Sequence, residues 1–131
     1  MIKGIDHIAI AVSSIEKTAK LFEIYFGLSI EHKERLEKQS IRLAIINIGG
    51  VNIELIEPLT KDSSVANFIM KRGEGIHHIA FKVKKIEKVL NELRKKGVKI
   101  LDREPRKGMR GKKIAFISPG NVAGTLIELC E

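Results

Sequence analysis

The sequence contains few of the residues that stabilise small proteins covalently or that stack on nucleic-acid bases. Of its 131 residues only Cys130 is a cysteine, which excludes an internal disulfide framework and a Cys-x-x-Cys zinc site. There is no tryptophan and only one tyrosine, and proteins bind single-stranded nucleic acids largely on exposed aromatic rings. No apolar run approaches the roughly 20 residues of a membrane-spanning helix. We therefore expect no nucleic-acid partner and no membrane association.

Positive charge is what the sequence has in excess. Lys and Arg number 24 against 16 Asp and Glu, which gives a net charge of +8. A basic surface indicates a nucleic acid, an anionic membrane or a polyanionic small molecule as the partner, and the scarcity of aromatic residues disfavours the first. The composition also suits a thermophilic protein with a charged surface, since amide side chains are few. We attribute the positive charge to a combination of heat adaptation and a polyanionic ligand. Because residues 1–7 lack the apolar core of a signal peptide, we expect a cytoplasmic protein.

One segment of the sequence occurs twice. Residues 5–17 and 76–88 are identical at 8 of 13 positions at an offset of 71, and the Ile-Glu-Leu of residues 53–55 recurs at 127–129. A repeat of this kind indicates one structural module used twice. We accordingly divide a single domain, residues 1–131, into module one at 1–58, a connecting segment at 59–73 and module two at 74–131.

Hydrophobic periodicity predicts the same order of elements in both modules. In the first, an apolar helical stripe is flanked by suitable caps, Ser13 or Ser14 before it and Gly27 after it. The Gly49-Gly50 pair predicts a hairpin turn. The predicted strands are 5–12, 28–36, 40–48, 51–57, 76–83, 98–103, 112–118 and 124–130, and the predicted helices are 14–26, 63–72 and 85–96. Each module is therefore βαβββ, and the expected fold is α+β, with the two modules forming a curved mixed sheet around a cleft.

Strand alternation places one His and one Glu of each module on the side of its strand that faces away from the helix. These residues are His7 and Glu54 in module one, and His78 and Glu128 in module two. Taken singly, a strand Glu is usually solvated, and a strand His is usually a hydrogen-bonded or surface residue. Their recurrence in both modules instead predicts a cleft in which two imidazoles and two carboxylates bind a divalent ion.

These features resemble the vicinal oxygen chelate superfamily, in which paired βαβββ modules form a metal cleft. Within it the chain is similar to the methylmalonyl-CoA epimerase family over essentially its whole length. The more specific matching stretches are Gly-Glu-Gly-x-His-His-x-Ala at residues 73–80 and Glu-Pro-Arg-x-Gly at 104–108. Further matching segments lie at 5–12, 53–59, 113–116 and 126–129.

The resemblance implies a ligand set and a reaction. The metal ligands would be His7, Glu54, His78 and Glu128. Some epimerases have Gln at the position of Glu54. His77 would face the other side of its strand and pack or hydrogen-bond there. The implied enzyme is an isomerase that interconverts R- and S-methylmalonyl-CoA by proton abstraction α to the thioester, through a metal-stabilised enolate, with Glu128 as the acid or base. The implied cofactor is Co²⁺ first, then Ni²⁺, Mn²⁺ or Zn²⁺, the implied partner is an acyl-CoA substrate, and the implied assembly is a homodimer.

The sequence departs from the family pattern at two places. A second Glu that some epimerases carry aligns with Leu43, which leaves Glu37, Gln39 or a metal-bound water as candidates for the second acid or base. Residues 118–121 stand where the family commonly has a His-Pro-Lys stretch, so we expect different substrate contacts there.

A basic stretch at residues 103–113 has two interpretations. It is either a mobile loop that holds the phosphates or the carboxylate of a substrate, or a solvated hairpin loop in a lysine-rich protein. The sequence favours neither. On the first interpretation, the candidate substrate-binding residues are Arg106, Lys107, Arg110 and Lys113.

Two other functions remain open at this point. A glyoxalase I-like lactoylglutathione lyase would use the same four ligands, and Glu at position 54 suits it slightly better than it suits the epimerases with Gln. The stretches after residue 71 favour the epimerase. A small-molecule-binding protein of the same fold without catalysis is disfavoured because all four candidate ligands are present.

Overall fold

The computed structural model describes residues 1–131, which divide into two units, each with strands and helices. Ile8–His77 form one, called here the α1 unit, while Met1–His7 and His78–Glu131 together form the other, called the α3 unit. The strands β1 (Ile2–Ala11) and β5 (Gly75–Val83) each contribute to both units. The first part of β1 therefore belongs with the second sequence module, so the units cut across the modules at 1–58 and 74–131.

The α1 unit follows the elements predicted for the first module. Its strands run in the order β2-β3-β4-β1, and the β2–β3 and β3–β4 pairs are antiparallel. Its elements are α1 (Ile15–Phe26), β2 (His32–Leu36), β3 (Ile41–Ile48), β4 (Val51–Pro58) and α2 (Ser64–Arg72). The predicted start of β2 at residue 28 is wrong, because Leu28 and Ile30 pack against the α1 core instead of pairing as a strand.

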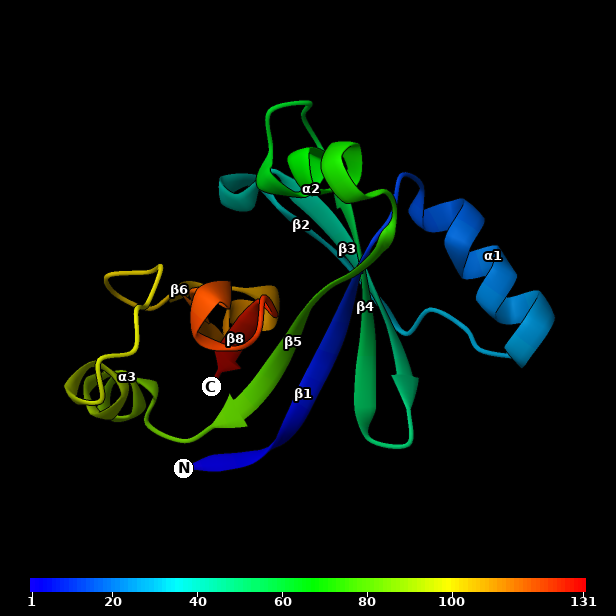
Figure 1. Cartoon of the computed structure of the whole chain (residues 1–131). Coiled ribbons are helices and arrows are strands. Elements are labelled where there is room, and N and C mark those ends of the chain that lie inside the picture. The colour runs from blue at the N-terminus through cyan, green and yellow to red at the C-terminus, as the bar shows by residue number, and fades with distance from the viewer. The chain divides into compact units, whose positions relative to one another are not determined.

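Local signals explain where α1 and the β3–β4 hairpin begin and end. The Ser14 hydroxyl accepts the N–H of Lys17 at 3.2 Å, and Gly27 closes the helix at φ 66°. Gly49 and Gly50 both have positive φ, as a two-residue hairpin turn requires. The helix then covers one sheet face (Figure 1), where it contacts a buried cluster of Val12, Ile15, Ala44, Ile46 and Leu55.

The α3 unit contains a mixed sheet in the order β1-β5-β8-β7-β6. β5 and β8 are parallel, whereas the β7–β8 and β6–β7 pairs are antiparallel. Its remaining elements are α3 (Ile86–Lys95), β6 (Arg106–Lys107), β7 (Lys113–Ile117) and β8 (Ile127–Cys130). Both modules thus have the βαβββ order, and the predicted α+β class is confirmed.

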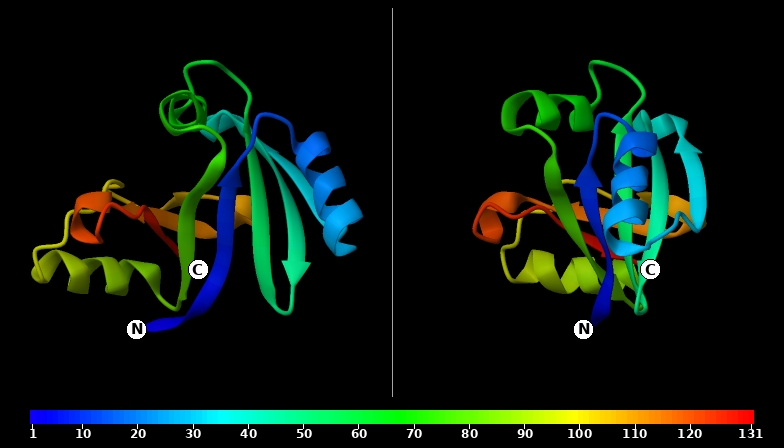
Figure 2. Two further views of the ribbon diagram at one scale, coloured as in Figure 1. Left: turned by 45° about the vertical axis from the view of Figure 1, so that its right-hand side comes forward. Right: turned by 90° about the vertical axis from the view of Figure 1, so that its right-hand side faces the viewer.

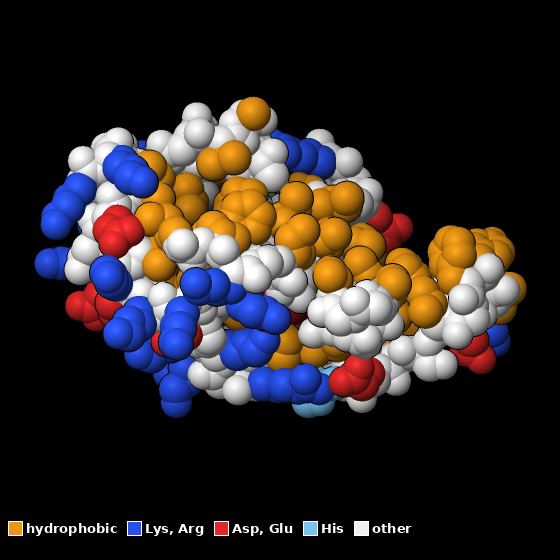
Figure 3. All heavy atoms as spheres, turned by 90° about the horizontal axis from the view of Figure 1, so that it is seen from below, with side chains coloured by type: hydrophobic (Ala, Val, Ile, Leu, Met, Phe, Trp, Pro, Cys, Tyr) orange, Lys and Arg blue, Asp and Glu red, His pale blue; other side chains and the backbone are white.

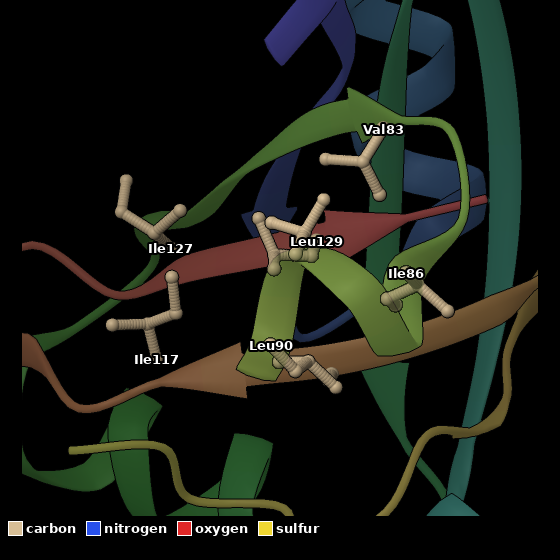
Figure 4. Packing of buried hydrophobic residues seen from close by; sticks show 8 residues of the cluster. Val83, Ile86, Leu90, Ile117, Ile127 and Leu129 are labelled. Atoms are coloured by element: carbon tan, nitrogen blue, oxygen red, sulfur yellow. The ribbon is translucent and has the colours of Figure 1, made fainter. Parts of the chain in front are cut away.

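The core of the α3 unit lies between α3 and one face of its sheet. Figure 4 shows Ile86 and Leu90 of the helix in one buried cluster with Ile117, Ile127 and Leu129 of the strands, and the two views of Figure 2 show α3 against β7 and β8. Leu90 and Leu129 are each 1% exposed. Since strand side chains alternate, Glu128, between Ile127 and Leu129, and His78, next to Ile79 of the same core, face the opposite side of the sheet.

The predicted strand at 98–103 is wrong. The segment makes only an isolated bridge, Ile100 with Ile117, in which Leu101 donates its N–H to the Phe116 carbonyl at 2.8 Å and the Lys99 carbonyl accepts from Ser118 at 3.0 Å. The Asp102 carboxylate then accepts the N–H of Phe116 at 2.7 Å. A side chain therefore accepts the N–H of Phe116 where a strand would offer a backbone carbonyl, and the bridge does not continue as a strand. The second strand of the module is instead the short β6, inside the basic stretch. The last strand starts at Ile127, not at residue 124, because Ala123 and Gly124 form a turn with positive φ.

No helix of the chain is long and apolar enough to cross a membrane. Figure 3 shows Lys and Arg side chains gathered toward one side of the face that it views, in keeping with the net charge of +8.

Candidate metal and acid-base site

Three of the predicted site residues meet within the α3 unit. His7 on β1, His78 on β5 and Glu128 on β8 come from neighbouring strands, and each is at most 4% exposed. The Nε2 atoms of His7 and His78 are 3.2 Å apart. Glu128 places Oε1 3.5 Å from Nε2 of His7 and Oε2 3.2 Å from Nε2 of His78. Of the four residues that were predicted to converge, His7, His78 and Glu128 therefore lie together in this unit, whereas Glu54 belongs to the α1 unit.

The register of the sheet accounts for this meeting. Ala80 is opposite Glu128 in the parallel β5–β8 pair, and a small side chain there leaves room beside His78. Phe116 is opposite Glu128 in the antiparallel β7–β8 pair, and its ring meets His78 edge-on at 5.1 Å. The carboxylate therefore lies next to an apolar wall rather than in water.

Burial is the main influence on Glu128. It raises the pKa of this carboxyl to about 7, against the smaller opposing effects of the nearby His7 and Arg106. A group that titrates near neutrality can both remove and return a proton under ordinary conditions, as an acid–base catalyst must. The same group in water would be ionised throughout the neutral range.

The metal-free protein should lose stability as the pH rises from about 5 to about 8. Between the ordinary pKa of 4.5 and about 7, the folded protein binds more protons at Glu128 than the unfolded chain does, so the free energy of unfolding falls with pH. At roughly 1.4 kcal/mol per pH unit, the fall is about 3 kcal/mol. Urea unfolding in EDTA measures it. Glu128→Gln should flatten the pH dependence, and parallel curves for the two proteins would contradict the assignment.

A second buried carboxylate lies beside the cluster. Asp6 accepts from Nδ1 of His7 at 2.8 Å and from the Lys112 ammonium at 2.8 Å. Burial alone would raise the pKa of Asp6, but these two partners outweigh it and hold the pKa below its usual range. Cys130 lies close by, and burial together with the charges of Asp6 and Glu128 raises the pKa of its thiol. Cys130 therefore remains protonated at neutral pH and is a poor nucleophile.

The donor set of the cluster fits a divalent metal ion. One ligand atom each from His7, His78 and Glu128 lies within 4.8 Å of the others, and all three residues are buried. With Nδ1 of His7 bonded to Asp6, its Nε2 offers a lone pair to the cluster, which is the arrangement found at metal-bound histidines. Two imidazole nitrogens and a carboxylate suit Co²⁺, Ni²⁺, Zn²⁺ and related ions.

Glu54, Leu43, Glu37 and Gln39 lie in the α1 unit. Glu54 on β4 is 5% exposed and is opposite Ile45, while Ile53 and Leu55 on either side of it pack in the α1 core. Leu43 is fully buried in β3. Glu37 lies on the surface in an ion pair with Arg35, and Gln39 ends the one-turn helix that follows β2. His77 contacts the ring of Phe68 at 4.9 Å, as the expected packing role requires.

The basic residues differ in their relation to the cluster. Arg106 lies over the ring of Phe116 at 5.4 Å and binds Asp102 at 3.1 Å, so its guanidinium is next to the wall that meets His78. Lys113 binds Glu87 of α3 at 2.8 Å, and α3 covers the other face of the sheet. Lys107 and Arg110 lie exposed in the stretch between them.

Sequence reasoning missed three residues at this site. Asp6 bonds to His7, Phe116 contacts the ring of His78, and Lys112 donates to Asp6. The Asp-His dipeptide was a usable signal for Asp6, because metal-binding histidines commonly donate to a carboxylate. Lys112 gave no signal, since its partner is 106 positions away in the sequence.

Comparison with known proteins identifies the family. The model of the Glyoxalase/Bleomycin resistance protein/Dioxygenase superfamily matches residues 6–116. The uncharacterized protein YqjC of Bacillus subtilis is 47% identical over 127 residues, which cover 97% of this chain and 91% of that protein. The ethylmalonyl-CoA/methylmalonyl-CoA epimerase of Cereibacter sphaeroides is 31% identical over 131 residues, with 98% of each covered.

A solved structure gives the same result. A variant of the Streptomyces coelicolor methylmalonyl-CoA epimerase, in complex with 2-nitronate-propionyl-CoA, superposes with a TM-score of 0.95 at 36% identity and covers 99% of this chain and 94% of that one. The chain belongs to the Glyoxalase/Bleomycin resistance protein/Dioxygenase superfamily, and within it is an enzyme of the methylmalonyl-CoA epimerase family.

Proposed function

We propose that this protein interconverts the R and S epimers of methylmalonyl-CoA by removing the proton α to the thioester and returning it to either face. The observation that carries this is the buried cluster of His7, His78 and Glu128, in which burial raises the pKa of Glu128 in the metal-free protein. The reaction needs a group that gains and loses a proton readily near neutral pH. It also needs an electrophile for the charge that develops on the thioester oxygen.

His7, His78 and Glu128 would hold a divalent ion, and the sequence repeat adds Glu54 as a fourth proposed ligand. When bound, such an ion acts as a Lewis acid toward carbonyl oxygens. Co²⁺ is the first candidate, with Ni²⁺, Mn²⁺ and Zn²⁺ as alternatives, because all accept nitrogen and oxygen ligands. The homodimeric state, the cytoplasmic location and the adaptation to heat are parts of the proposal that rest on the sequence alone.

The remaining roles follow from the contacts of the α3 unit. Glu128 transfers the proton, and the Phe116 ring keeps water from its carboxylate. Arg106 is proposed to bind an anionic group of the substrate, because Asp102 and Phe116 hold its guanidinium beside the cluster and its side chain is 47% exposed. Arg110 and Lys107, on the same stretch, would contact the phosphates of CoA, whereas the bond of Lys113 to Glu87 makes it the weakest of the four candidates.

Proton exchange tests the proposal directly. The purified protein is mixed with methylmalonyl-CoA in deuterated water, once with Co²⁺ and once with EDTA, and the α-proton is followed by NMR. We expect metal-dependent loss of the proton signal together with interconversion of the two epimers. Exchange with EDTA at the same rate would refute the metal role.

A negative result would also be informative. Absence of exchange with every candidate metal would overturn the epimerase assignment, and the hemithioacetal of glutathione would be tested next as a lyase substrate. Tight acyl-CoA binding without any turnover would instead favour a binding protein of the same fold.

A further inference from the structure

The carboxylate of Asp6 is shared between the cluster and the basic stretch. Oδ2 accepts from Nδ1 of His7 and Oδ1 accepts from Nζ of Lys112, both at 2.8 Å. Asp6 is 6% exposed, so water does not compete freely for either oxygen. Short charge-assisted hydrogen bonds at a buried carboxylate fix the geometry of both partners.

The bond to Asp6 determines which nitrogen of His7 faces the cluster. A neutral imidazole carries its proton on one nitrogen, and a carboxylate at Nδ1 favours the proton there. Nε2 then presents a lone pair, and it is this atom that lies 3.2 Å from Nε2 of His78 and 3.5 Å from Glu128. Without Asp6, the imidazole could rotate or adopt the other tautomer.

Lys112 holds Asp6 from the basic stretch. The backbone around it is anchored by Met109, which is 5% exposed, and by Gly108, where a Cβ would lie 2.8 Å from Cγ2 of Ile114. This close packing requires a glycine and fixes the path of the chain into Lys112. The side chain of Lys112 is 33% exposed, and its ammonium is directed at the buried Asp6 rather than into solvent.

The two modules are not equivalent at this point. The sequence position that corresponds to Asp6 in the second module is His77, which contacts Phe68. The repeat therefore gives His7 a neighbouring carboxylate and gives His78 none at the equivalent position. The bond between Asp6 and His7 is therefore not a consequence of the repeat.

We propose that Asp6 and Lys112 are positioning residues, which hold His7 in the Nδ1–H tautomer and couple its orientation to the conformation of residues 106–112. This rests on the proposed role of His7 as a metal ligand. It follows that anything that displaces Lys112, such as an anion drawn to the basic stretch, would loosen His7.

Two measurements on the full-length protein test this. Long-range ¹H–¹⁵N NMR of the metal-free protein reports the tautomer of each of its four histidines, with His7 assigned from His7→Ala. Visible absorption of bound Co²⁺ reports affinity without turnover. The variants are Asp6→Asn, Lys112→Met and Lys112→Arg. The matched control is Glu87→Gln, which removes a 2.8 Å carboxylate–lysine bond on α3, on the other face of the sheet.

We expect Asp6→Asn to reduce the Nδ1–H population of His7 and to weaken Co²⁺ binding by about 10- to 100-fold, the usual cost of losing the partner that orients a ligand. Lys112→Met should act in the same direction, by about 10-fold, and Lys112→Arg should restore most of the loss. Glu87→Gln should change neither readout.

Each contrary result has a definite meaning. Unchanged tautomer and affinity in Asp6→Asn would overturn the role of Asp6, and a Lys112→Met that matches Glu87→Gln would overturn that of Lys112. If Asp6→Asn does not fold, the Lys112→Met and Lys112→Arg pair decides the test. Failure of the wild-type protein to bind Co²⁺ would refute the proposed metal site, whereas the tautomer comparison would still decide whether Asp6 orients His7.

Discussion

Glu128→Gln is expected to lower the rate of α-proton exchange on methylmalonyl-CoA by about 100- to 10,000-fold, which is the usual contribution of a positioned acid–base group. The amide keeps the shape of the side chain and an oxygen toward one of the two histidines, but it cannot gain and lose a proton near neutrality. The exchange rate is measured by NMR in deuterated water at saturating Co²⁺, so that weaker metal binding by the variant does not account for the loss.

Glu54→Gln is the matched control for that substitution. Both residues are buried strand carboxylates at equivalent positions of the repeat, with exposures of 5% and 4%. Glu54 is proposed as a metal ligand without a proton-transfer role, and an amide oxygen can replace its carboxylate oxygen as a ligand. Glu54→Gln should therefore keep the rate of α-proton exchange within about 10-fold of the wild-type rate. Equal losses in the two variants would show that Glu128 acts only as a ligand.

The local parts of the fold were predictable because their causes are local. Ser14, Gly27 and the Gly49-Gly50 pair each set a backbone conformation through their own side chain or its absence. The prediction of a strand at 98–103 was wrong because its cause is not local. Its apolar alternation is real, since Ile100 packs in the α3 core, but the Asp102 side chain takes the N–H of Phe116, and no local pattern reveals this.

The positions of the candidate metal ligands were predictable, but the residues that orient them, Asp6 and Lys112, were not. Period-2 alternation and the repeat suffice to place His78 and Glu128 on the face opposite Ile127 and Leu129. The same alternation puts Asp6 on the other side of β1 from His7, yet the side chain is buried and reaches back to Nδ1. Only the three-dimensional path of residues 108–112, which brings Lys112 to Asp6, accounts for a buried carboxylate at that point.

His78→Ala, compared with His77→Ala, should separate the metal ligand from its neighbour in the sequence. His78→Ala removes one of three converging donor atoms, and we expect Co²⁺ affinity to fall by more than about 100-fold, since loss of an orienting partner alone costs about 10- to 100-fold. Exchange activity should fall with it. His77→Ala removes a ring that contacts Phe68 within the α1 unit, so its effect should be confined to stability.

The comparison is sharp because the two residues differ in environment and not in type. His78 is 4% exposed and 3.2 Å from the Glu128 carboxylate, whereas His77 packs against an aromatic ring. Co²⁺ titration followed by visible absorption gives the affinity, and thermal unfolding in EDTA gives the stability of both variants. If His77→Ala weakened Co²⁺ binding as much as His78→Ala, the cluster of His7, His78 and Glu128 would not be the metal site. Loss of Co²⁺ binding in His78→Ala but not in His77→Ala would support a metal site formed by His7, His78 and Glu128.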